Sequence, residues 1–299
     1  MMILQLSSRP ADKSTPDVTG NRCTSAPPRV ARAALFTRTA CALALTLIWF
    51  NGGPCAAHQK WLLPNFFVVD KWPVWLSFDV TWSDRPFTAE SGVGAQPISI
   101  VDPNGRRQTP PSVFVGKTKS VVEMELTERG TYRLEAIDPL AYWTQIEEGG
   151  QTTWLKQPKN EVTAASIKRS DLYWSKAAAY VTLGDPTTVS PADDAEPLEL
   201  RLEQHPNRVT AGQALKLAVT SFGKPVPRAE VKVFAPGAVG HEPSSVITCG
   251  DDGGGTFTPD EAGRFLLACQ LEREVPDDPK ADIHSFNMYL TLEVQPNGE

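Results

Sequence analysis

Apolar and polar residues alternate strictly in several short stretches of the chain. At 74–82, valine, leucine, phenylalanine, valine and tryptophan occupy every second position, with mostly polar residues between them. The same period of two returns at 98–101, 121–126 and 130–136, and turns rich in glycine, proline and aspartate separate these stretches. A period of two is typical of a half-buried strand, so the pattern predicts a β-sandwich.

The second half of the chain repeats this organisation. Leucines and valines alternate with other residues at 198–202 and 215–219, and further strands are expected at 231–233, 265–269 and 289–294. About seven short strands in about a hundred residues are typical of an immunoglobulin-like or transthyretin-like sandwich.

A short internal repeat indicates that the two sandwiches are related. Gly-x-Tyr-x-Leu-x-Ala at 130–136 corresponds to Gly-x-Phe-x-Leu-x-Cys at 263–269, and each follows an acidic turn. We therefore expect an all-β protein with two consecutive β-sandwich domains, 58–190 and 198–297. A linker at 191–197 joins them. The less regular, aromatic-rich segment at 138–185 is expected to be an insertion in the first domain.

Residues 1–57 predict a leader that ends in a signal peptide. An apolar run at 39–50 follows three arginines and ends at Asn-Gly-Gly-Pro, and Cys-Ala-Ala at 55–57 provides the small residues of a cleavage site. We expect cleavage after Ala57 and export to the periplasm. No second apolar run has the length of a membrane span, so the mature chain is expected to lack a transmembrane segment.

The charge of the mature chain argues against a nucleic-acid partner. The whole chain has a formal charge of −6, and the six basic and two acidic residues of 1–57 leave −10 for 58–299. A strongly acidic protein is repelled by phosphate backbones. Cys249 and Cys269 are the two cysteines beyond the leader, and in an oxidising compartment they are expected to form a disulfide. Two buried thiols are the alternative.

Cleavage after Ala57 gives the mature chain an N-terminal histidine. The α-amine and imidazole of His58 together can chelate a divalent transition metal such as nickel, cobalt or copper. His284 and His241 are the candidate partners, and His205, beside a proline, is a weaker one. The alternative is that each histidine is an isolated residue on the surface or in a turn.

Aromatic residues interleaved with polar groups at 138–185 suggest a second kind of site. Trp143, Trp154 and Trp174 are candidates to line a groove for a sugar or peptide. In the other interpretation, these aromatic side chains pin the insertion to the sandwich.

The chain carries no recognisable catalytic motif. Gly-x-Ser-x-Gly, His-Glu-x-x-His and phosphate-binding glycine loops are all absent from the sequence. We therefore expect a protein that is not an enzyme. An N-terminal histidine on a β-sandwich is also the pattern of copper monooxygenases that act on polysaccharides, which leaves a copper-dependent oxidase as a further hypothesis.

Several short motifs resemble one bacterial family. They are Ala-His-x-x-Trp-Leu at 57–62, Tyr-x-Ser-Lys-Ala at 173–177, Gly-Lys-Pro-Val-Pro-x-Ala-x-Val at 223–231, Asp-Asp-Gly at 251–253, Gly-x-Phe at 263–265 and Leu-Thr-Leu-Glu-Val at 290–294. Together they resemble periplasmic proteins with the domain of unknown function 4198. The resemblance implies a non-enzymatic accessory protein of nickel or cobalt uptake. A membrane transporter or outer-membrane receptor is its expected partner.

Overall fold

The structure is a computed structural model that describes residues 59–94, 98–163, 166–188, 196–238 and 240–298. These residues belong to one compact unit. They form three β-sheets with two short 3₁₀ turns, which confirms the predicted all-β class.

The first sheet has five antiparallel strands. The strand order is β1–β3–β8–β7, and β4 pairs with β3 at Thr81 and Trp82, just beyond the residues of β3 that pair with β8. The strands are β1 Gln59–Pro64, β3 Val74–Ser83, β4 Ser91–Gly92, β7 Ser112–Val115 and β8 Ser120–Leu126.

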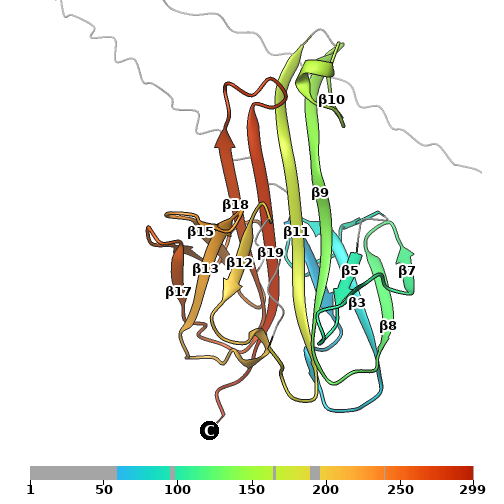
Figure 1. Cartoon of the computed structure of the whole chain (residues 1–299), viewed down its shortest axis with the longest axis vertical. Helices are drawn as coiled ribbons and strands as arrows, with labels where there is room; N and C mark the ends of the chain where they lie inside the picture. Colours follow the sequence, from blue (N-terminus) through green and yellow to red (C-terminus); the bar gives the residue numbers. More distant parts are fainter. Residues whose placement is uncertain (1–58, 95–97, 164–165, 189–195, 239, 299) are drawn as a thin grey trace, which may run out of the picture. The chain divides into compact units, whose positions relative to one another are not determined.

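The second sheet has ten strands, and we call it the shared sheet because it contains residues of both predicted domains. Its order is β16–β15–β18–β19–β11–β9–β5–β6, with β10 paired to β9 and β2 paired to β11. Figure 1 shows the long strands β18, β19, β11 and β9 side by side. The strands are β2 Val68–Val69, β5 Ile98–Val101, β6 Arg107–Gln108, β9 Gly130–Glu148, β10 Gln151–Leu155, β11 Ile167–Leu183, β15 Glu230–Phe234, β16 Ser245–Thr248, β18 Gly263–Glu274 and β19 Ile283–Val294.

The third sheet has four strands around β13. They are β12 Glu199–Leu202, β13 Leu215–Ser221, β14 Lys224–Pro225 and β17 Gly254–Phe257. The 3₁₀ turns are η1 Lys159–Glu161 and η2 Pro206–Arg208. Among the residues that the structure describes, no helix is both long and apolar enough to cross a membrane.

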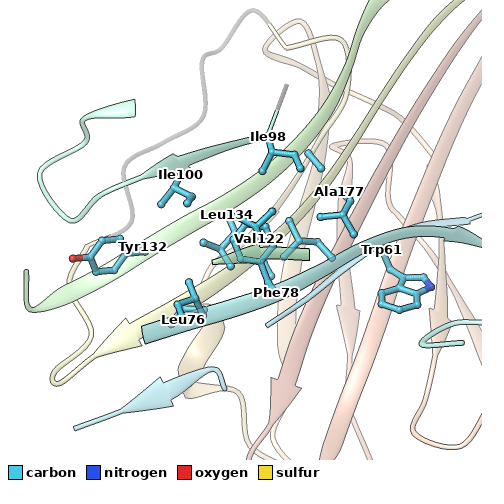
Figure 2. Close-up of a cluster of buried hydrophobic side chains, with 14 of the residues drawn as sticks. Trp61, Leu76, Phe78, Ile98, Ile100, Val122, Tyr132, Leu134 and Ala177 are labelled. Carbon is cyan, nitrogen blue, oxygen red and sulfur yellow. The ribbon is translucent and has the colours of Figure 1, made fainter. Parts of the chain in front are cut away.

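The shared sheet has a hydrophobic core on each face. On β18, Leu266 and Ala268 join a core with the first sheet, whereas Phe265 and Leu267 join a core with the third sheet. Successive side chains of a strand point to opposite faces, so the first and third sheets cover opposite faces of the shared sheet. Figure 2 shows part of the first core, where Phe78, Val122 and Leu134 lie close together.

A parallel strand pair joins the two halves of the chain. β11 runs beside β19 from the pair Asp171 and Ile283 to the pair Ala179 and Thr291. Most of the linker expected at 191–197 lies outside the described residues. The segment at 138–185 differs from the irregular insertion that we expected, because β9, β10 and β11 are regular strands that extend the shared sheet.

The internal repeat recurs in the backbone geometry. Gly130 opens β9 with φ of +128°, and Gly263 opens β18 with φ of +136°. A Cβ atom on Gly130 would lie 2.7 Å from Pro103, and one on Gly263 would lie 2.6 Å from Pro236. Both corners therefore require glycine, because other residues rarely adopt this conformation and have no space there.

Candidate functional site

A hollow of about 450 Å³ lies where β9, β10 and β11 meet the end of β3. We call it the aromatic pocket. Its walls are mainly apolar, with two carboxylates and one ammonium group among them. The lining residues are Trp82, Asp138, Pro139, Ala141, Trp143, Trp154, Lys156, Asp171 and Tyr173.

A β-bulge brings the pocket residues of β9 onto one face. Tyr173 pairs with Ala141, but Ser175 pairs with Asp138, so β9 has one more residue than β11 between these two pairs. Pro139 and Leu140 together lie opposite the single residue Trp174. Pro139 has no backbone N–H to donate to the neighbouring strand, which suits a bulge. In a regular strand Asp138 and Ala141 would point to opposite faces, whereas the bulge allows both to line the pocket.

Three tryptophans and a tyrosine form the apolar part of the walls. Trp154 on β10 is 43% exposed, and its strand pairs with β9. The ammonium group of Lys156 lies 5.7 Å from the ring centre of Trp143, a cation–π distance. Burial raises the pKa of Tyr173 well above its ordinary value, so its hydroxyl stays protonated.

The polar floor of the pocket is Asp138, held by two donors. The ammonium group of Lys60 donates to Asp138 Oδ2 at 2.9 Å, and the hydroxyl of Ser175 donates to the same oxygen at 2.6 Å. The Lys60 side chain is fully buried and lies 5.2 Å from the ring centre of Trp82. Burial lowers the pKa of Lys60, and the charge of Asp138 opposes that shift.

A second carboxylate, Asp171, stands on the wall formed by β11. Arg169 Nε donates to Asp171 Oδ1 at 2.6 Å, and the same guanidinium pairs with Glu272 at 2.8 Å. Burial raises the pKa of Asp171, and the ion pair with Arg169 opposes the increase. Both carboxylates of the pocket therefore have a cation of their own.

The structure separates the three predicted aromatic candidates. Trp143 and Trp154 both line the pocket. Trp174 is 4% exposed and packs in the core under the third sheet, so its inclusion in a ligand groove was wrong. Trp174 follows Tyr173 on β11, and adjacent residues of a strand face opposite sides. Trp82 and Asp138 were not predicted as pocket residues, although Trp82 stands at the end of a clearly alternating stretch.

The predicted metal ligands are not brought together among the described residues. His58 lies outside them. His241 has its Nδ1 4.0 Å from Asp84 Oδ1, and His284 has its Nε2 3.4 Å from Asp278 Oδ2. Within the described part of the chain, no three histidine, cysteine, aspartate or glutamate residues form a group that could hold a metal ion.

His205, the weaker candidate, has a structural role. Its Nδ1 accepts a hydrogen bond from the backbone N–H of Asn207 at 3.1 Å, which caps η2. Its Nε2 lies 2.9 Å from Thr131 Oγ1. Both ring nitrogens are thus used within the protein.

The expected disulfide is not formed, because Cys249 and Cys269 are both buried free thiols. The backbone N–H of Cys249 donates to the carbonyl oxygen of Ala229, on one side of the β15 strand. Cys269 is the strand partner of Val231 on the other side, so β15 lies between the two cysteines. Two strand spacings of about 4.8 Å separate their Cα atoms by about 10 Å, whereas a disulfide needs less than about 7 Å. Burial raises the pKa of Cys269 to about 12, which keeps this thiol protonated and unreactive.

Three solved structures are distantly similar to this chain. The D0–D1 domain of intimin is 13% identical with a TM-score of 0.22, and the match covers 78% of this chain and 97% of that one. The adhesin InvE of Yersinia pseudotuberculosis is 12% identical with a TM-score of 0.21, over 80% of this chain and 61% of that one. A chimeric titin Z1Z2 is 14% identical with a TM-score of 0.19, over 81% of this chain and all of that one. At these TM-scores the matches carry no argument about function.

The comparison with family models identifies the family of this chain. No curated protein matches the chain. The family model described as "Domain of unknown function (DUF4198)" matches residues 55–273, which is well over half of the chain. The protein therefore belongs to the family defined by the domain of unknown function 4198.

Proposed function

We propose that this protein is an exported, non-enzymatic binding protein that holds a small amphipathic ligand in the aromatic pocket. The observation that supports this most directly is the juxtaposition of Trp82, Trp143 and Trp154 around one hollow of about 450 Å³. Pockets for small ligands are typically about 300–1,000 Å³, largely apolar, and equipped with a few fixed polar groups.

The polar groups of the pocket are held in place by the protein itself. Lys60 and Ser175 fix Asp138, and Arg169 fixes Asp171. A preorganised acceptor loses little side-chain entropy when a ligand binds. The two carboxylates are therefore suited to accept hydrogen bonds from a bound ligand rather than to break its bonds.

Tryptophan fluorescence and titration calorimetry test the proposal. The purified protein is titrated with neutral oligosaccharides, with tripeptides that carry a central aromatic residue, and with choline. At least one class should bind, and binding should be lost in Trp143→Ala and Trp154→Ala. Trp75→Ala is the matched control, because Trp75 is 62% exposed and lies outside the pocket. Equal responses from all four proteins would rule the pocket out as the binding site.

A second candidate function, metal handling in the periplasm, rests on a different observation. Gln59, the first described residue, is the strand partner of Ser83. Asp84 follows Ser83, and its Oδ1 lies 4.0 Å from Nδ1 of His241. Cleavage after Ala57 would give His58, the residue before Gln59 in the sequence, a free α-amine beside its imidazole, and the two groups together can chelate a divalent transition metal.

Calorimetric titration with Cu(II), Ni(II) and Co(II) tests this second candidate. Binding should weaken in His58→Ala, in His241→Ala and in a form with one extra residue before His58. The control is His284→Ala, because His284 lies beside Asp278 rather than Asp84. N-terminal sequencing of the exported protein must give His58 first, and any other N-terminus contradicts this candidate.

A further inference from the structure

The charges around the aromatic pocket restrict the ligands that it can take. Asp138 is paired with Lys60, and Asp171 is paired with Arg169. Each carboxylate of the pocket is thus already paired with a cation of the protein, so a cationic ligand has no unpaired carboxylate to bind. An anionic ligand could pair with Lys156, but it would also meet the carboxylate of Asp138, and like charges at close range are repelled. The pocket thus favours a ligand without net charge.

Asp138 retains one oxygen for the ligand. The hydrogen bonds from Lys60 and Ser175 both end on Oδ2. Within the described part of the chain, no side chain donates to Oδ1, although Asp138 lines the pocket and is 15% exposed. A carboxylate group only accepts hydrogen bonds. The ligand must therefore bring a donor.

The remaining walls suit a ring with an apolar face. Trp143, Trp154 and Tyr173 present aromatic surface to the hollow, and Lys156 adds donors at its rim. Aromatic side chains offer a large apolar face, and the tyrosine adds a hydroxyl. A ligand with C–H groups on a ring face and hydroxyls around its edge matches this arrangement of groups.

Resting on the ligand-binding function proposed above, we infer that the ligand is a neutral saccharide that donates a hydroxyl hydrogen bond to Asp138 Oδ1. Its ring stacks on the tryptophans, and Lys156 donates to a second oxygen. Lys60 and Ser175 are positioning residues, which orient Asp138 without touching the sugar.

Saccharides that differ in charge give the sharpest test, and the neutral and cationic members of the set share one backbone. Acetylated chitooligosaccharides are neutral, their deacetylated counterparts are cationic, and oligogalacturonates are anionic. Neutral cello- and maltooligosaccharides widen the neutral set. Calorimetry at up to about 10 mM saccharide detects a site with a Kd of about 1 mM. A neutral saccharide should bind, and its charged counterparts should bind at least about tenfold more weakly.

Asp138→Asn should weaken the binding of that saccharide by about ten- to a hundredfold, the range for loss of a hydrogen bond to a charged group. Trp75→Ala should bind like the unmodified protein. If Asp138→Asn does not fold, the double variant Lys60→Met with Asp138→Asn removes the buried charges together and must show the same loss.

The possible failures are distinguishable. If no neutral saccharide binds, or if one binds equally well to the Asp138 variants, the saccharide inference is overturned. Binding of choline or an aromatic tripeptide that depends on Trp143 would then leave the proposed binding function standing. If no titrated ligand depends on Trp143 and Trp154, both proposals fall.

Discussion

Lys60 holds a positive charge inside the protein, and its only ion-pair partner among the described residues is Asp138. Lys60→Met leaves the Asp138 carboxylate without that partner at the floor of the pocket. We expect this variant to lose about 3–5 kcal/mol of unfolding free energy, as when one member of a buried ion pair is removed. Urea unfolding monitored by circular dichroism measures the change.

The control for this prediction is an exposed ion pair of the first sheet. Lys119 lies 2.7 Å from Asp79, and both side chains are solvent-accessible. Lys119→Met should change the unfolding free energy by about 1 kcal/mol or less, because exposed pairs contribute little. Equal losses in the two methionine variants would contradict a special role for the Lys60–Asp138 pair.

His205 should make the stability of the protein depend on pH. Burial, followed by the charge of Arg208, lowers its pKa below the ordinary value. Just below about pH 6.5 the unfolded chain therefore binds more protons at this site than the folded protein does. Stability is fully present above that pH and falls as the pH drops toward the lowered pKa, where protonation also breaks the Asn207 N–H bond to Nδ1.

His205→Asn separates this contribution from those of other groups. Asparagine is a good N-cap and does not titrate, so the cap of η2 can persist without the protonation step. Unfolding midpoints in urea at about pH 7.5 and pH 5.5 should differ less in this variant than in the unmodified protein. His241→Asn, on an exposed side chain, should keep the original difference. An unchanged difference in His205→Asn would refute the assignment.

At the scale of elements, β11 divides its aromatic side chains between two environments. Tyr173 lines the pocket, whereas Trp174 packs in the core under the third sheet. Trp174→Ala should cost about 3–5 kcal/mol of unfolding free energy, because it leaves a large cavity in that core. Trp154→Ala, at a 43% exposed position, should cost much less but abolish ligand-dependent fluorescence changes. Thermal melts of both variants measure the contrast.

Alternation along single strands explains which elements the sequence predicted. The stretches that became β3, β5 and β8 were identified because polar and apolar residues alternate there. Residues 138–185 showed no such period, for two physical reasons. β11 is buried on both faces along much of its length, so apolar residues occur in succession. The bulge at Pro139 shifts the period of β9 by one residue.

The pocket could be predicted only in part for the same reason. Trp143 and Trp154 were identified because both are aromatic residues in an otherwise polar stretch. Asp138 is 78 residues from Lys60 in the chain, and the pair forms only when β1 packs against the shared sheet. No local pattern indicates such a contact.

At the scale of the whole described unit, the sequence predicted two sandwiches, and the structure has two cores, one on each face of a sheet that both halves of the chain build. The parallel pairing of β11 with β19 joins strands that are more than a hundred residues apart. β9, β11, β18 and β19 all carry buried side chains on both faces. Parallel pairing between distant segments leaves no turn signal in the sequence, so two separate domains were the simpler expectation.

The shared sheet also determines how the two cores should unfold. Loss of the first core would expose one face of strands whose other face lines the second core, so neither core should persist alone. We therefore expect one cooperative transition in calorimetry, with equal calorimetric and van't Hoff enthalpies. Leu134→Ala in the first core and Leu217→Ala in the second should each cost about 2–5 kcal/mol and lower the same transition.

Two independent sandwiches would behave differently under the same substitutions. Leu134→Ala would then lower one transition and leave another in place, and Leu217→Ala would do the reverse. Strands β18 and β19 pair along twelve residues and supply side chains to both cores, which opposes such a separation. A calorimetric trace with two peaks that respond separately to the two variants would show that the continuous sheet does not couple the cores energetically.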